Sequence, residues 1–232
     1  MDINTTTGVF TPVVAGNISF TDIALSETNQ LYGVAFSGLY SLYNIDQITN
    51  TSTLIGNTGT TLNALGFDNT NQLYASGENQ LSTINTTTGN ATVVNNLSDY
   101  SSAGDIVFDP VNNRFLGTSS TPVNSTLFSI NPINGVATQI GSIGFGDVVG
   151  LFFENGPLFG YTYARQQIII NPTTGAGTFD KLVTGGSGNI FGAASLPSTG
   201  PDPQPTPEPS TMLGLLAMSG IELSQLKRRK GK

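Results

Sequence analysis

The sequence predicts an all-β fold, a small β-propeller of about five blades, and three observations support this prediction. Only 10% of the residues are charged, and 28 Gly and 12 Pro are available for turns. Thr, Val, Ile, Phe and Tyr are plentiful, a mixture typical of strands and tight turns rather than helices. A turn motif recurs along the chain, with a strand motif between its copies. A period of roughly 40–45 residues that holds about four short strands is typical of a propeller blade.

The turn motif is Ile, then Asn or Asp, three residues, Gly or Asn, two residues, and Thr. Successive copies of its Gly or Asn are 42, 39, 46 and 40 residues apart. Gly and Asn tolerate positive φ, and the Asn or Asp before them can bond turn amides, so two strands should meet here. The five copies are Ile3-Asn4…Gly8…Thr11, Ile45-Asp46…Asn50…Thr53, Ile84-Asn85…Gly89…Thr92, Ile130-Asn131…Gly135…Thr138 and Ile170-Asn171…Gly175…Thr178.

The strand motif is an apolar strand, an acidic or Asn-rich turn, and then an apolar, an aromatic and a small residue. Together with the turn motif it gives each period about four strands, an inner apolar one first. A fifth inner strand is predicted to start at 190–193. The copies of the closing triplet include Leu31-Tyr32-Gly33, Leu73-Tyr74-Ala75, Phe115-Leu116-Gly117 and Leu158-Phe159-Gly160.

The two ends of the propeller domain, 1–196, are predicted to share one blade. Residues 1–15 supply only its last strand or two, and residues 190–196 supply only its first, so this blade is incomplete. Such sharing ties the ends together and hides edge strands. We interpret the missing strand, and the lack of a signal peptide, as the result of a start codon assigned too late. A decayed gene or a natural three-stranded blade would explain the same gap.

Cys and His are both absent from the sequence. Their absence removes thiol nucleophiles, imidazole bases and nearly all zinc, copper or haem chemistry. No other combination of residues forms a recognisable catalytic motif, so we expect no enzyme activity, no catalytic residues and no cofactor.

Charge is divided unevenly along the chain. Residues 1–226 hold all 15 acidic side chains and three basic ones, whereas the last six positions hold five basic residues. An acidic body repels phosphate backbones, so nucleic acid is not an expected partner. The basic end, which includes Lys227, Arg228, Arg229 and Lys230, is typical of a membrane-proximal topology signal.

The C-terminal part has a distinct composition. Residues 197–209 contain six prolines and should form an extended linker. Pro207, Glu208 and Pro209 are followed by an apolar run, 212–221, and by the basic end. This tail, 207–232, resembles the PEP-CTERM sorting signal of Gram-negative bacteria. The resemblance implies an exported protein whose tail is recognised by an exosortase at the membrane, in bacteria that usually make extracellular polysaccharide.

The apolar run should form a short helix. It is shorter than the roughly 20 residues that span a bilayer, and Glu222 interrupts it. Two arrangements remain open, a membrane span or an anchor that lies at the interface.

Three acidic residues precede inner strands and could meet at one mouth of the propeller channel. They are Asp22, Asp105 and Asp147. Their carboxylates could hold Ca²⁺ through oxygen ligands. The simpler interpretation is that they accept hydrogen bonds from turn amides, and we expect no resident metal.

The sequence therefore predicts a non-catalytic protein at the cell surface, a binding or structural module associated with extracellular polysaccharide or a surface protein. Two alternatives remain open, a lactonase-like propeller hydrolase and a decayed paralogue without function. Fold similarity alone would not transfer the first of these activities.

Overall fold

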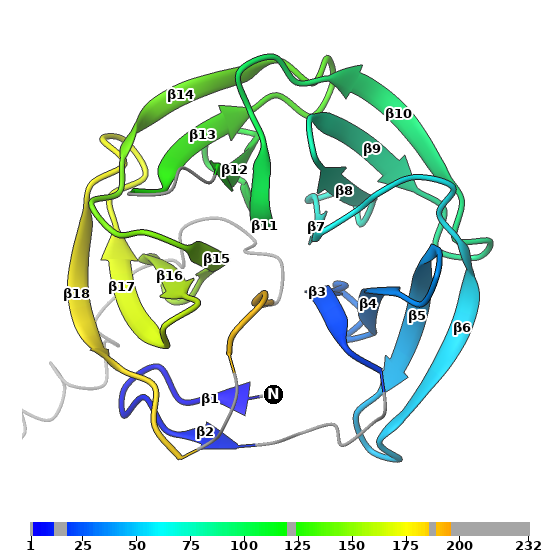
Figure 1. Ribbon diagram of the computed structural model, residues 1–232, viewed down its shortest axis with the longest axis horizontal. Coiled ribbons are helices and arrows are strands. Elements are labelled where there is room, and N and C mark those ends of the chain that lie inside the picture. The colour runs from blue at the N-terminus through cyan, green and yellow to red at the C-terminus, as the bar shows by residue number, and fades with distance from the viewer. Residues whose placement is uncertain (1, 12–17, 120–123, 186–188, 196–232) are drawn as a thin grey trace, which may run out of the picture. The chain divides into compact units, whose positions relative to one another are not determined.

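The structure is a computed structural model that describes residues 2–11, 18–119, 124–185 and 189–195. Within these ranges every regular element is a strand, and Figure 1 shows the strands as sheets around one axis. The all-β propeller fold is thus confirmed, with four complete blades. Blade 1 comprises β3 (Phe20–Leu25), β4 (Leu31–Phe36), β5 (Tyr40–Asp46) and β6 (Thr51–Asn57); blade 2 comprises β7 (Ala64–Phe67), β8 (Leu73–Gly77), β9 (Gln80–Ile84) and β10 (Ala91–Asn96); blade 3 comprises β11 (Ser102–Asp109), β12 (Arg114–Ser119), β13 (Thr126–Ile130) and β14 (Ala137–Ser142); blade 4 comprises β15 (Val148–Phe153), β16 (Leu158–Thr162), β17 (Gln166–Ile170) and β18 (Gly177–Leu182).

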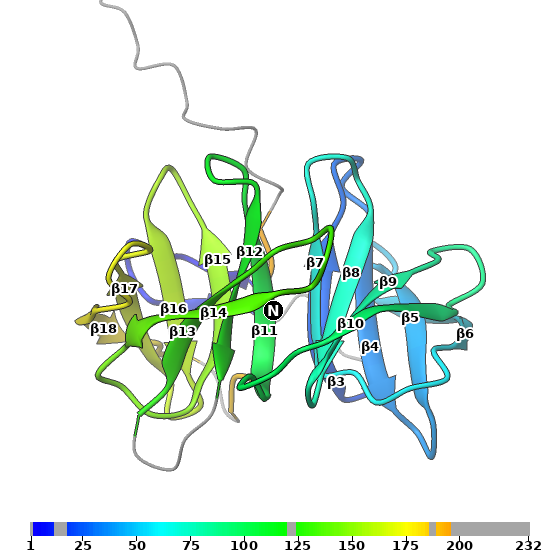
Figure 2. The same cartoon turned by 90° about the horizontal axis from the view of Figure 1, so that it is seen from above.

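Each blade is a four-stranded antiparallel sheet whose strands follow chain order from the axis outward. The inner strands β3, β7, β11 and β15 surround the axis, and the fourth strands form the rim (Figure 1). Seen from the side, the inner strands run along the axis while the outermost strands cross it at a large angle (Figure 2). This change of direction is the twist that L-residue strands accumulate across a sheet.

The predicted turn motif connects the third and fourth strands of every blade. In blade 2 the Asn85 side chain accepts hydrogen bonds from the amides of Thr87 and Thr88, at 2.9 and 3.0 Å. Gly89 then closes the turn with φ of +80°. Only glycine fits there, because a Cβ would lie 2.7 Å from the carbonyl oxygen of Gly56 in blade 1. The turns of blades 3 and 4 meet the preceding blade in the same way, at Gly135 and Gly175, so the recurrence of glycine in the motif follows from this docking.

Apolar side chains fill the spaces between consecutive blades. The interfaces between blades 1 and 2, 2 and 3, and 3 and 4 bury nine, nine and eight apolar residues respectively. Phe115, Leu42 and Leu127 are among the largest side chains that are fully buried. Burying such a side chain contributes about 1.5–3 kcal/mol, so the interfaces between blades are the main source of stability.

The part of the ring between blades 4 and 1 is here called the fifth sector. It contains β1 (Asp2–Ile3), β2 (Phe10–Thr11) and the segment 190–195. Strands β1 and β2 pair as a two-stranded sheet, whereas the predicted inner strand at 190–193 is not a strand. The expectation of about five blades is therefore met by four blades and one incomplete sector.

Blade 4 holds the hairpin of β1 and β2 in place. The Thr184 amide donates to the carbonyl of Gly8 at 2.9 Å. The side chains of Gln167 and Lys181 donate to the carbonyl of Thr5 at 2.8 and 2.6 Å. This turn therefore docks on β18 in the same way that the Gly89 turn docks on blade 1.

The predicted linker 197–209 and tail 207–232 lie outside the described residues, as does the proposed C-terminal helix. In the ranges that the structure describes, no helix has the length and apolar character that a membrane span requires.

Candidate functional site

One register position recurs on all four inner strands, close to the axis. Its apolar residue pairs with a small residue of the second strand, as Ile23 does with Gly33 and Ile106 with Gly117. The side chain immediately before it is the one that differs between blades. In chain order, this preceding residue is Asp22, Ala64, Asp105 and Gly150.

Asp22 links blade 1 to blade 2. Its side chain is buried, and its Oδ2 accepts a hydrogen bond from the Leu65 amide at 2.6 Å. A Cβ at Gly192 would overlap Oδ1 of Asp22. The segment 190–195 therefore passes directly against this carboxyl group, and glycine is required at the point of contact.

Asp105 makes the equivalent link from blade 3 to blade 4. Its Oδ2 accepts hydrogen bonds from the Leu151 amide at 2.6 Å and from the Ala193 amide at 3.1 Å. The second bond fixes segment 190–195 near the axis. Inner-strand amides that face the channel have no partner in their own sheet, and these two carboxyl groups accept from two of them, Leu65 and Leu151, as well as from the Ala193 amide.

The two carboxyl groups are within hydrogen-bonding reach of each other. No other described group donates to Oδ1 of either. Burial raises the pKa of Asp22 well above its ordinary value, and the charge of Asp105 adds to the rise. Burial also raises the pKa of Asp105, against the opposing effect of the Leu151 and Ala193 amides. Both carboxyl groups are therefore expected to keep protons to a higher pH than an ordinary aspartate does.

Asp147 does not take part in this arrangement. Asp147 is exposed and has a backbone φ of +52°, and its carbonyl oxygen accepts a hydrogen bond from the Tyr163 amide. Gly150 occupies the corresponding position of blade 4. Among the described residues, no group of three or more acidic, His or Cys side chains is placed to hold a metal ion.

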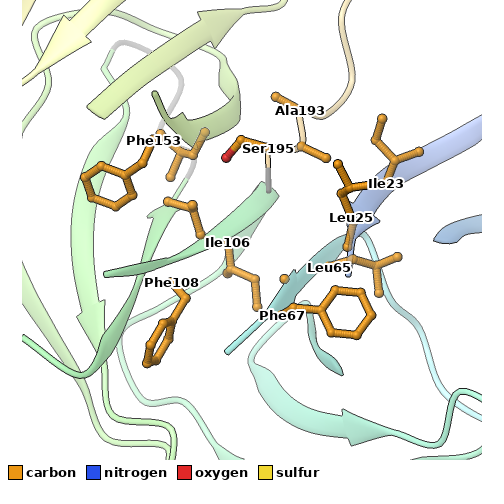
Figure 3. Close-up of a pocket in the computed structure, with 14 residues that line it drawn as sticks. Ile23, Leu25, Leu65, Phe67, Ile106, Phe108, Phe153, Ala193 and Ser195 are labelled. Carbon is orange, nitrogen blue, oxygen red and sulfur yellow. The ribbon is translucent and has the colours of Figure 1, made fainter. Parts of the chain in front are cut away.

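The channel beyond the aspartates is narrow and apolar. It holds a cavity of about 30 Å³, enough for roughly one water molecule. Figure 3 shows side chains from all four inner strands converging on it, together with Ala193 and Ser195. The labelled side chains from the inner strands are Ile23, Leu25, Leu65, Phe67, Ile106, Phe108 and Phe153.

A larger hollow of about 350 Å³ lies on the rim of blade 3. Arg114 on its wall is held in place, since Nε donates to Asp109 at 3.0 Å and Nη2 donates to the carbonyl of Pro172 at 3.0 Å. Sequence reasoning missed this hollow because its residues come from separate turns and strands. Side-chain amides and hydroxyls predominate in its lining, which comprises Asn112, Asn113, Arg114, Ser129, Asn131, Asn134, Val136 and Thr138.

Solved propeller structures are similar to this chain at low sequence identity. A chain from a nidogen/laminin complex matches with a TM-score of 0.60 and 14% identity, covering 77% of this chain and 69% of that one. A protein of unknown function from Bacteroides thetaiotaomicron VPI-5482 gives 0.59 and 16%, covering 74% and 50%. An auxiliary nutrient binding protein from Bacteroides ovatus ATCC 8483 gives 0.51 and 12%, covering 72% and 48%.

The chain spans about half the length of the two Bacteroides proteins. Likeness at these identities shows the fold alone. No family model matches the sequence, and no curated protein matches it.

Proposed function

We propose that this chain is a non-catalytic, exported propeller that binds extracellular polysaccharide through the hollow of blade 3. The lining of that hollow carries the proposal. Its Asn side chains offer both donors and acceptors, and Ser129 and Thr138 add hydroxyl groups. Uncharged groups of this kind match the hydroxyl groups of a neutral sugar chain. A volume of about 350 Å³ lies within the range of small-molecule sites.

The centre of the ring supports a binding role rather than catalysis. Asp22 and Asp105 are buried and hydrogen-bonded to the amides of the channel wall. A general acid or base must reach the proton that it transfers, and the adjoining cavity of about 30 Å³ is too small for a substrate. Turnover of a lactone or ester by the purified protein would instead favour the hydrolase alternative.

Binding to polysaccharide is tested by blocking the hollow without disturbing the fold. Thr138 is exposed on β14, and the replacement Thr138→Arg would place a long charged side chain in the hollow. The matched control is Thr92→Arg, at the same turn-motif position of blade 2. We expect wild type and the control to bind neutral bacterial polysaccharide in affinity electrophoresis, and Thr138→Arg to bind at least tenfold more weakly. Equal binding by both variants would refute the site.

Export and anchoring are a second part of the proposal. The order of Pro207-Glu208-Pro209, an apolar run and a basic end supports it. A reporter fused to residues 197–232 should be processed in a host that contains an exosortase and left unprocessed in its exosortase-deleted strain. Glu208→Ala should block processing, whereas Glu222→Ala leaves the motif intact and should not. Processing that is independent of the exosortase would contradict this assignment.

A further inference from the structure

The dipeptide Asn-Gly occurs twice in the sequence, at Asn134-Gly135 and at Asn155-Gly156. Asparagine is a thermolabile residue, and it reacts fastest before glycine, because glycine has no Cβ to hinder attack by its own backbone nitrogen. Three features control the reaction in a folded chain: the freedom of the glycine amide, the freedom of the asparagine side chain, and the mobility of the backbone that brings them together. The two copies differ in all three.

The reaction is a ring closure followed by hydrolysis. The backbone nitrogen of glycine loses its proton and attacks Cγ of the asparagine side chain. A new C–N bond forms as the bond from Cγ to the side-chain nitrogen breaks, and ammonia departs. Water then opens the cyclic succinimide at either of its carbonyl carbons, which gives aspartate or isoaspartate. The two steps together consume water and release ammonia, and no other reactant is required.

The first copy, Asn134-Gly135, is held in the turn motif of blade 3. The Gly135 amide donates to the carbonyl of Asn131 at 2.8 Å, so its nitrogen is not free to attack. Oδ1 of Asn134 accepts a hydrogen bond from the Val136 amide at 3.0 Å, which fixes the side chain. The carbonyl of Asn134 accepts a further bond, at 2.8 Å, from Nδ2 of Asn95 in blade 2. The docking of this turn on blade 2 therefore also protects it chemically.

The second copy, Asn155-Gly156, forms the turn between β15 and β16 and lacks these restraints. Both residues are exposed, with φ of +51° and +106°. Positive φ at both central residues is typical of a two-residue hairpin turn, whose flanking residues can exchange two backbone hydrogen bonds. Only one is present, from the Glu154 amide to the carbonyl of Pro157 at 3.2 Å. The other cannot form, because proline has no amide hydrogen.

The reactive groups of the second copy are also free. Within the described part of the chain, no group is hydrogen-bonded to the Asn155 side chain or to the Gly156 amide. A Cβ on Gly156 would meet nothing beyond its chain neighbours within 4 Å, so the turn has room to change conformation. Exposed loop tips of this kind open locally at low cost in free energy.

We propose that Asn155 is a site of spontaneous covalent modification, which the folded protein converts through a succinimide to aspartate and isoaspartate, while Asn134 stays intact. Turn geometry decides which copy reacts, since the dipeptide is the same in both. The inference does not depend on the polysaccharide site. Asn134 lines that hollow, so its protection also keeps the lining free of a new negative charge.

Modification would change the turn in two ways. Aspartate or isoaspartate adds a negative charge next to Glu154. Isoaspartate also carries the main chain through the former side chain, which lengthens the backbone between β15 and β16 by one carbon atom. The turn adjoins the pair of Phe153 and Leu158, and Leu158 is buried between blades 3 and 4. The modified chain should therefore lose hydrogen-exchange protection at the start of β16.

Peptide mapping of the full chain by mass spectrometry tests the proposal. The purified protein is incubated at physiological temperature in mildly alkaline buffer, and isoaspartate is identified by enzymatic carboxyl methylation of the separated peptides. In the native protein, peptides with Asn155 should deamidate at least tenfold faster than those with Asn134. In concentrated urea, which removes both turns, the two rates should agree within about threefold. Equal rates in the native protein, or a tenfold difference that persists in urea, would overturn the proposal.

Two variants test the structural cause. Pro157→Ala restores the missing amide hydrogen and should slow modification of Asn155 at least threefold, because the turn can then close with both hydrogen bonds. Asn95→Ala removes the bond from blade 2 to Asn134 and should speed modification there, while Asn155 keeps its wild-type rate. Unchanged rates in both variants would refute the role assigned to these hydrogen bonds.

A third variant locates the product. Asn155→Gln keeps an amide but closes the larger ring far more slowly, so isoaspartate should disappear from peptides that contain 154–157. If isoaspartate forms in this variant with the wild-type yield, the modification lies elsewhere in the chain and the assignment is wrong.

Discussion

The interfaces between complete blades and the fifth sector use the same repeat but differ in what the repeat can bury. Between blades 2 and 3, nine apolar residues are buried and Phe115 is fully enclosed. Beside blade 4, four of the described apolar residues are buried, and Phe191 remains 52% exposed. The docking turn is present in both places, at Gly135 and at Gly8. A turn motif thus positions a blade, but a second strand is needed to bury its faces.

Removing a large side chain from a complete interface should have the greatest effect on stability. Phe115→Ala should lower the free energy of unfolding by about 3–5 kcal/mol, because it leaves a cavity in a closely packed interface. Phe191→Ala, in the fifth sector, should cost less than about 1 kcal/mol. Urea denaturation of both variants measures the difference. Similar losses would mean that the two regions are equally packed.

Removing the Asp105 carboxyl group, which joins the fifth sector to blade 3, should have the second-largest effect on stability. Asp105→Ala leaves the buried Leu151 and Ala193 amides without their acceptor. Since an unsatisfied buried amide costs about 1–3 kcal/mol, we expect a loss of about 2–4 kcal/mol. Asp105→Asn keeps an acceptor oxygen and adds a donor toward Asp22, so it should cost about 1 kcal/mol or less. Equal losses in the two variants would contradict the bonding described.

The axial pair should also make stability depend on pH. Burial raises the pKa of both Asp22 and Asp105 above the ordinary aspartate value. The folded state therefore binds protons more tightly than the unfolded state. The stabilisation from protonation of the pair is complete below the unfolded pKa of about 4 and is lost as pH rises through the raised folded values.

Asp22→Asn isolates this effect from the other titrating groups. With one carboxyl group neutral at every pH, the repulsion that develops in the wild type cannot arise. The difference in unfolding free energy between wild type and Asp22→Asn should therefore shift in favour of the variant as pH rises. Chemical denaturation between pH 4 and 9 measures it, and a difference that does not change with pH would contradict the raised pKa values of the pair.

The smallest effect is expected where the hairpin of β1 and β2 joins blade 4. Lys181→Met removes the ammonium donor to the carbonyls of Thr5 and Thr6. Global stability should fall by less than about 1 kcal/mol, whereas the hairpin amides should exchange with solvent faster. Mass-spectrometric hydrogen exchange on peptides from 1–11 compares the variant with wild type. Unchanged exchange would mean that these bonds do not hold the hairpin.

The sequence was sufficient to predict the fold because its repeat is tied to local chemistry. The side chains of Asn85 and its equivalents accept hydrogen bonds from turn amides, and only glycine fits at position 89. These requirements make the motif easy to recognise in the sequence. The sharing of one sector by the two ends of the domain also followed from the positions of these motifs. The prediction of an inner strand at 190–193 was wrong, because an inner strand needs a second strand beside it to pair with.

The site was less predictable than the fold. Asp22 and Asp105 stand immediately before the apolar residue of their inner strands, whereas Asp147 lies three residues before Gly150. Only the strand register distinguishes Asp22 and Asp105 from Asp147. A β-bulge near the start of the inner strand shifts this register in blades 1, 3 and 4. The hollow of blade 3 depends on contacts such as that between Arg114 and Pro172, 58 residues apart, which sequence spacing does not reveal.

Native-state hydrogen exchange of the unliganded chain tests the central claim most directly, since it measures the stability of each region separately. The amides of β12, in a complete blade, should exchange only through global unfolding. Those of β1 and β2 should exchange through openings that cost several kcal/mol less. If β1, β2 and β12 all exchange with the free energy of global unfolding, the fifth sector is as complete as the other blades and the account is wrong.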